Sequence, residues 1–234
     1  MNYSLSDLPD SGKDAVVYMD IMLNNENMGR LYIRLFRDVF PAGVENFIRI
    51  AAGNTYRVVK NGNGKYTYKK EIKRTYEGCK IFRFLHNNYL VCGDIYNNDG
   101  TNAGTIYSDQ PIAPVFGDFY YPHETKGLVS LVPYHDETTG RLFYDSTFMI
   151  TLDDIKPSNI LHDLDQDQIV IGQIYDGLDV LDKMNQLIKP YARRRYPRFV
   201  IGETGVYRKN SNNRRMPPKP KESRKFCNEP TCCE

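Results

Sequence analysis

Short runs of hydrophobic residues with a two-residue period dominate the chain. Leu31, Ile33 and Leu35 alternate with Tyr32 and Arg34, which is the pattern of a strand buried on one face. The apolar segment 15–23 precedes this strand, and the turn-forming residues 24–27 separate the two, so the pair predicts a β-hairpin. Further short runs predict strands over residues 80–84, 89–92, 128–132, 147–151, 169–174 and 198–207.

Two other segments have the period of amphipathic helices. The first begins at Pro41, ends near Gly53 and has one apolar face, formed by Val44, Phe47, Ile48 and Ala51. The second covers residues 177–188, and its apolar face is formed by Leu178, Leu181, Met184 and Ile188. Many short strands and two helices predict one mainly β domain over residues 14–207, a barrel or sandwich capped by two helices.

Three segments do not belong to this pattern. The basic stretch 57–74 contains Asn-Gly turn signals and predicts an inserted loop or hairpin. Its Gly62–Lys65 part lacks the first glycine of a phosphate-binding loop, because Val59 occupies that position. The acidic stretch 163–167 begins like a calcium-binding loop, but Gln168 and Ile174 stand where that loop needs glycine and glutamate. We therefore interpret it as a solvated acidic loop.

The charge of the chain is concentrated at its C-terminal end. The net charge is +2, yet residues 208–225 contain eight lysines and arginines and a single glutamate. This basic stretch predicts a disordered tail over 208–234, and residues 1–13 predict a flexible N-terminal arm. No apolar run is long enough to span a membrane, and the polar N-terminus is unlike a secretion signal, so we expect an intracellular, cytoplasmic protein without membrane contact.

The five cysteines do not predict a disulfide framework or a metal site. Two lie in the domain, at positions 79 and 92, and three lie in the tail, at positions 227, 232 and 233. An odd number without paired spacing favours free thiols in a reducing compartment. We expect no metal and no cofactor.

Several motifs, in this order, resemble the cyclophilin family of peptidyl-prolyl cis-trans isomerases. They are FPAGVENF at 40–47, YEGC at 76–79, IFRFL at 81–85, CGD at 92–94, DGTNAGTIY at 99–107, GLVSL at 127–131 and STFMIT at 146–151. The resemblance extends over residues 15–207. It implies a closed antiparallel eight-stranded barrel capped by two helices, and proline-containing peptides as substrates.

The resemblance assigns the catalytic role to Arg83, which stands where the family has the arginine that faces the prolyl nitrogen. Most of the family's other site positions have changed. Asn88 and Tyr89 replace its pocket phenylalanine and methionine, and Val91 replaces a glutamine that binds the substrate backbone. By the same alignment, the remaining site positions are Val132, Pro133, Met149, Asp163, Leu164 and Gln168, of which Leu164 keeps the family's residue.

These replacements predict isomerase activity that is weak or lost. Asn88 and Asp163 make the proline pocket more polar, and Val91 and Pro133 offer no side-chain amide to a substrate. The chain also has no tryptophan, and the family uses one in binding cyclosporin, so we expect weak or no cyclosporin binding.

Two alternatives to an isomerase stay open. The chain could be a non-catalytic structural or interaction module that contacts partners, including other copies, through its two terminal arms, the inserted segment 57–74 and the stretch 189–198. It could also bind nucleic acid or an acidic partner through the basic tail and the arginines 193–195. The second alternative ranks last, because no stacking-aromatic motif accompanies the tail.

Overall fold

The computed structural model describes residues 15–53, 56–60, 66–70, 74–107, 110–114, 121–188 and 197–207, with only the backbone described at 56–60 and 66–70. The N-terminal arm, the C-terminal tail and the tail cysteines predicted from the sequence lie outside these residues. Among the helices of the described residues, none has the length and hydrophobicity needed to cross a membrane.

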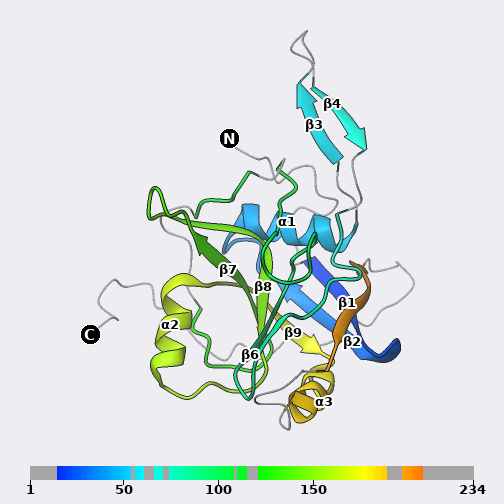
Figure 1. Cartoon of the computed structure of the whole chain (residues 1–234), viewed down its shortest axis with the longest axis vertical. Helices are drawn as coiled ribbons and strands as arrows, with labels where there is room; N and C mark the ends of the chain where they lie inside the picture. Colours follow the sequence, from blue (N-terminus) through cyan, green and yellow to red (C-terminus); the bar gives the residue numbers. More distant parts are fainter. Residues whose placement is uncertain are drawn as a thin grey trace.

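An eight-stranded antiparallel sheet forms the body (Figure 1). Its strands, in spatial order, are β10 (Phe199–Val206), β1 (Ala15–Leu23), β2 (Glu26–Leu35), β9 (Ile169–Asp176), β7 (Leu128–His135), β8 (Leu142–Thr151), β6 (Tyr89–Cys92) and β5 (Arg83–Leu85). The predicted hairpin is confirmed, because β1 pairs with β2 from Ala15↔Leu35 to Leu23↔Glu26. The mainly β fold expected from the alternating pattern is therefore present.

The sheet curls so that its two ends meet. The residues just before β5 hydrogen-bond to β10: the Gly78 amide donates to the Ile201 carbonyl (2.8 Å), and Lys80 forms a β-bridge with Val200. The inward side chains of all the main strands fill the interior, as alternation along each strand requires. Its fully buried centre includes Val17, Ile33, Val129, Leu131, Phe148, Ile171 and Phe199.

Both predicted helices are present at the expected places. Helix α1 (Pro41–Ala51) packs against β1, β8 and β10, and its Phe47 ring lies 5.0 Å from the Phe148 ring. Helix α3 (Leu178–Ile188) packs on β2 through buried residues that include Val180 and Met184.

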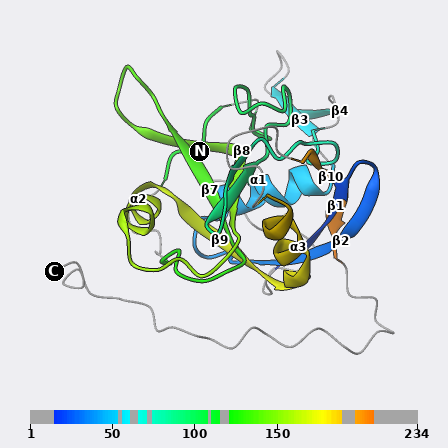
Figure 2. The same cartoon turned by 60° about the horizontal axis from the view of Figure 1, so that its bottom comes forward.

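A third helix corrects the sequence-based expectation. Residues 163–167 were expected to form a solvated loop, but they belong to helix α2 (Asn159–Asp167). Ser158 caps this helix by accepting a hydrogen bond from the Leu161 amide, and Leu161 and Leu164 form its buried face. Figure 2 shows α2 and α3 on separate sides of the barrel. Helix α2 is stabilised by the packing of Leu161 and Leu164 against the barrel. Two apolar positions are too few to predict a helix from the sequence pattern.

The inserted segment contains a hairpin, as one of the two sequence-based interpretations predicted. Strand β3 (Tyr56–Lys60) pairs with β4 (Tyr66–Lys70) in a separate two-stranded sheet. In Figure 1 this hairpin projects away from the eight-stranded sheet.

Candidate functional site

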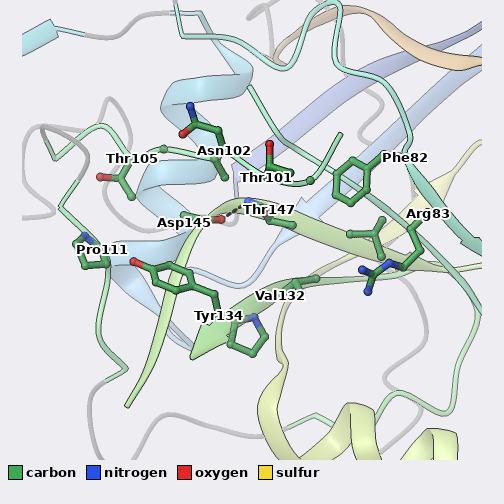
Figure 3. A pocket seen from close by; sticks show the side chains of 15 residues that line it. Phe82, Arg83, Thr101, Asn102, Thr105, Pro111, Val132, Tyr134, Asp145 and Thr147 are labelled. Atoms are coloured by element: carbon green, nitrogen blue, oxygen red, sulfur yellow. Dashed lines mark hydrogen bonds between the residues drawn. The ribbon is translucent and has the colours of Figure 1, made fainter. Parts of the chain in front are cut away.

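A cleft of about 460 Å³ lies on the outer face of β5, β6, β7 and β8 (Figure 3). The loop 100–105 forms one wall. The floor and the other wall come from Phe82, just before β5, and from the strand residues Arg83, Val91, Val132, Pro133, Tyr134, Asp145 and Thr147, with Pro111 at the rim. Four of the nine site residues expected from the sequence therefore line one cleft: Arg83, Val91, Val132 and Pro133.

Strand pairing places Arg83 beside the other expected residues. Arg83 pairs with Val91 across β5 and β6, and Val91 pairs with Met149 across β6 and β8. Paired residues of antiparallel strands point to the same face, so these three side chains form a row on the outer face of the barrel. The Arg83 side chain is exposed, and no other described residue forms a hydrogen bond or ion pair with it.

An apolar cluster closes the sheet face next to this row. Met149 is fully buried there, in contact with a group that consists of Val91, Ile155, Leu161 and Leu164 and the partly buried Phe82, Tyr89, Val132 and Ile160. Leu161 and Leu164 come from α2, so this helix covers Met149. Met149, Tyr89 and Leu164 are thus brought together, but they pack on each other and do not line the cleft.

The two remaining expected residues lie outside the cleft lining. The Asn88 side chain donates to the carbonyl of His86 (2.9 Å), and its backbone carbonyl accepts from Leu152 (2.7 Å), so it belongs to the β5–β6 turn. Gln168 caps the C-terminal end of α2, and its buried side-chain oxygen has no hydrogen-bond partner among the described residues. Asp163 is exposed on α2.

The wall formed by loop 100–105 depends on one carboxylate, Asp94. This buried side chain accepts hydrogen bonds from the backbone amides of Tyr96, Asn97, Asp99, Gly100, Thr101 and Asn102, at 2.8–3.3 Å. These backbone donors hold the pKa of Asp94 well below its usual range. Gly100 has a φ of +90°, and a Cβ there would lie 2.7 Å from the Phe82 ring, so the loop approaches the cleft closely only with glycine.

A buried chain of polar side chains attaches α2 to the barrel. His123 is fully buried. Its Nδ1 lies 2.7 Å from an Asp165 carboxylate oxygen of α2, and its Nε2 lies 2.8 Å from the Ser130 hydroxyl of β7. The residue types are those of a hydrolytic triad, but Ser130 is also fully buried, so its hydroxyl has no access to a substrate. The arrangement positions the helix that covers Met149.

Sequence reasoning missed Asp145 and Tyr134 at the end of the cleft away from Arg83. Both line the cleft in Figure 3. The strand predicted over 147–151 begins at Leu142, so Asp145 and Thr147 lie on the same face as Met149. Extending the alternation back through Tyr144 and Phe143 would have found this carboxylate.

Both described cysteines are free and buried, as expected. Burial raises the pKa of Cys79 to about 12 and that of Cys92 well above its usual range, so neither thiol is reactive near neutral pH. Among the described residues, no group of three or more histidine, cysteine, aspartate or glutamate side chains could hold a metal ion.

Comparison with known families defines the class of the protein. The family model described as "Cyclophilin type peptidyl-prolyl cis-trans isomerase/CLD" matches residues 18–206. The chain belongs to the cyclophilin family, as its motifs and their order predicted.

Individual relatives include a viral protein of similar length. The chain is 63% identical to the "Structural PPIase-like protein" of Acanthamoeba polyphaga mimivirus, over 99% of both chains. It resembles the solved crystal structure of the Mimivirus cyclophilin with a TM-score of 0.72 and 63% identity, covering 88% of this chain and 96% of that one. It is also 27% identical to the mouse NK-tumor recognition protein over 191 residues, which make up 81% of this chain and 11% of that protein.

Proposed function

We propose that this cyclophilin binds proline-containing peptides in the cleft beside Arg83 and isomerises them slowly or not at all. The observation that supports this best is the burial of Met149. The apolar side chains expected to hold a proline ring pack against α2, while Arg83 stays exposed at the rim.

Prolyl isomerisation needs binding and electrostatics but no nucleophile. The barrier for rotation about the peptide bond is about 18–20 kcal/mol, because twisting breaks the amide resonance. Twisting returns a lone pair to the prolyl nitrogen, and a guanidinium that donates to this nitrogen stabilises the twisted state more than the planar one. Arg83 supplies such a donor, with Val91 and Val132 as the apolar surface beneath a ring.

The other contributions to turnover are reduced. Burial of a proline-sized ring contributes about 2 kcal/mol to binding. Here Met149 is already covered by α2, so much of this contribution is lost. Val91 and Pro133 line the cleft without a side-chain amide, and each lost hydrogen bond to the substrate backbone costs about 0.5–1.5 kcal/mol. Together these losses correspond to about two to three powers of ten in kcat/KM.

A coupled assay with an alanine-alanine-proline-phenylalanine peptide tests this proposal. We expect kcat/KM about 100- to 1,000-fold below that of an intact cyclophilin assayed in parallel. Arg83→Ala is expected to remove the residual activity, while peptide binding, measured by fluorescence anisotropy, persists. A wild-type rate equal to that of the intact enzyme would contradict the weak-turnover proposal, and equal rates for Arg83→Ala and wild type would exclude Arg83 from catalysis.

A structural or interaction role is the second candidate, because the name of the mimivirus relative describes a structural protein. In this role the arm 1–13 and the tail 208–234 would hold another copy, and the β3–β4 hairpin would add a contact that is not sufficient alone. Light scattering of the full chain and of residues 14–207 tests it: we expect a mass above one chain for the former and of one chain for the latter. One-chain masses for both would rule out assembly through the arms.

Binding of nucleic acid or an acidic partner through the basic tail is a third, weaker proposal. We also propose an intracellular, cytoplasmic location. The buried free thiols of Cys79 and Cys92 support that location, since such thiols persist in reducing compartments.

A further inference from the structure

The end of the cleft away from Arg83 contains the carboxylate of Asp145. Asp145 lies on β8, and its carboxylate accepts a hydrogen bond from the Thr147 amide (2.7 Å). Among the residues that the structure describes, no lysine or arginine forms an ion pair with it. Burial raises the pKa of Asp145, and the nearby Asp94 carboxylate adds to this effect. A partly buried negative charge here is therefore poorly compensated by the protein itself.

The surroundings of Asp145 are rigid. Its backbone carbonyl accepts a hydrogen bond from the side chain of Asn46 in α1 (3.2 Å), and Asn46 is fully buried. The Gly104 amide of the loop wall donates to the buried Ser146 hydroxyl (3.2 Å), which attaches the loop to β8. The carboxylate is thus held at a defined place in the cleft before any ligand arrives.

An aromatic ring stands beside this carboxylate. Tyr134 is 42% exposed and lines the same end of the cleft (Figure 3). Burial is the main cause that raises the pKa of Tyr134, and the negative charge of Asp145 adds to it. A carboxylate next to a partly exposed aromatic ring is the pair that attracts an ammonium or guanidinium group, through a charge-assisted hydrogen bond and a cation–π contact.

We propose that the Asp145–Tyr134 end of the cleft binds a lysine or arginine side chain of the peptide whose proline lies beside Arg83. This inference rests on the proposed function and names its substrate class. Four residues of β8 separate Asp145 from Met149, which lies next to the Arg83–Val91 pair. A register shift in the β7–β8 pairing shortens this stretch of β8, so the rise of a regular strand gives an upper limit of about 13 Å. An extended peptide covers at most this length with about four residues, which places the cationic residue two to four positions from the proline.

Binding of labelled peptides to the full chain tests the proposal. Each peptide has one proline among alanines and one variable residue two, three or four positions before or after it. The variable residue is lysine, acetyl-lysine, norleucine or glutamate. At one position we expect the lysine peptide to bind about tenfold more tightly than the norleucine and acetyl-lysine peptides, since a hydrogen bond to a charged group contributes at least this much. The glutamate peptide is expected to bind most weakly.

Asp145→Asn is the matched variant, because its side-chain oxygen can still accept from the Thr147 amide. It is expected to bring the lysine and norleucine peptides to equal affinity, without weakening the norleucine peptide. Asp176→Asn removes an exposed carboxylate at the end of β9, outside the cleft lining, and is expected to keep the preference.

Failure of this proposal is distinguishable from failure of the proposed function. Equal binding of lysine, acetyl-lysine and norleucine peptides at every position overturns the cationic preference but leaves proline-peptide binding intact. A preference that survives in Asp145→Asn also overturns it. If replacing the proline by alanine leaves all affinities unchanged, both the preference for a prolyl peptide and the proposed function are wrong. The acetyl-lysine comparison uses only the wild-type chain, so the test does not depend on the folding of a variant.

Discussion

A double variant with Val91→Gln and Pro133→Asn is expected to raise kcat/KM for prolyl isomerisation about 10- to 100-fold. Both residues line the cleft beside Arg83 and lack a side-chain amide. Each new amide can form one hydrogen bond to the substrate backbone, worth about 0.5–1.5 kcal/mol, and about 1.4 kcal/mol corresponds to a tenfold rate change. The coupled peptide assay measures the gain directly.

The control for this prediction keeps the new amides and removes the guanidinium. Adding Arg83→Ala to the double variant is expected to lower its rate about 100-fold, the usual effect of losing one preorganised donor to the transition state. Leu187→Gln, on the exposed side of α3 and outside the cleft lining, is expected to change nothing. No gain in the double variant would mean that the covered recess at Met149, and not the missing amides, limits catalysis.

Asp94→Ala is expected to lower the free energy of unfolding by about 3 kcal/mol at pH 7. The buried carboxylate accepts six backbone hydrogen bonds from the loop 96–102, and hydrogen bonds to charged groups contribute about 1.5–3 kcal/mol each when a buried partner is lost. Solvation of the released amides offsets part of this sum. Urea unfolding measures the loss, and peptide binding should fall with it, since this loop leads into one wall of the cleft.

The pH dependence of that loss identifies the carboxylate as its source. The pKa of Asp94 is lowered in the folded protein, and the unfolded chain has an ordinary value of about 3.9. The stabilisation is therefore complete above about pH 5 and decreases as the pH falls toward the folded pKa. The difference between wild type and Asp94→Ala should shrink on acidification. A constant difference from pH 7 to pH 3 would show that packing, not charge, is responsible. Asp136→Asn, which alters an exposed turn, is expected to have a smaller effect.

Helix α2 shows where prediction from the sequence fails. Both amphipathic helices with four apolar positions on one face, α1 and α3, were predicted correctly. Helix α2 has only Leu161 and Leu164 buried, among acidic neighbours, and it forms because these leucines pack on Met149 and because Asp165 bonds to His123. These partners lie outside the helix segment, so the local sequence pattern does not predict the helix.

The candidate site divides in the same way. The family resemblance grouped Arg83, Val91, Val132 and Pro133 as site residues, and these four line one cleft. The resemblance could not show that Met149 and Leu164 pack on each other, because that contact joins β8 to a helix the sequence did not predict. Asp145 was overlooked because the predicted strand began two residues after it.

The sequence by itself determined the family, the antiparallel strands and two of the three helices, because these follow from local periodicity and from ordered motifs. Only the tertiary structure decided which apolar residues are buried against other side chains and which charged residues line the cleft. Burial depends on partners contributed by distant segments, and a single carboxylate such as Asp145 acquires its role from the walls around it.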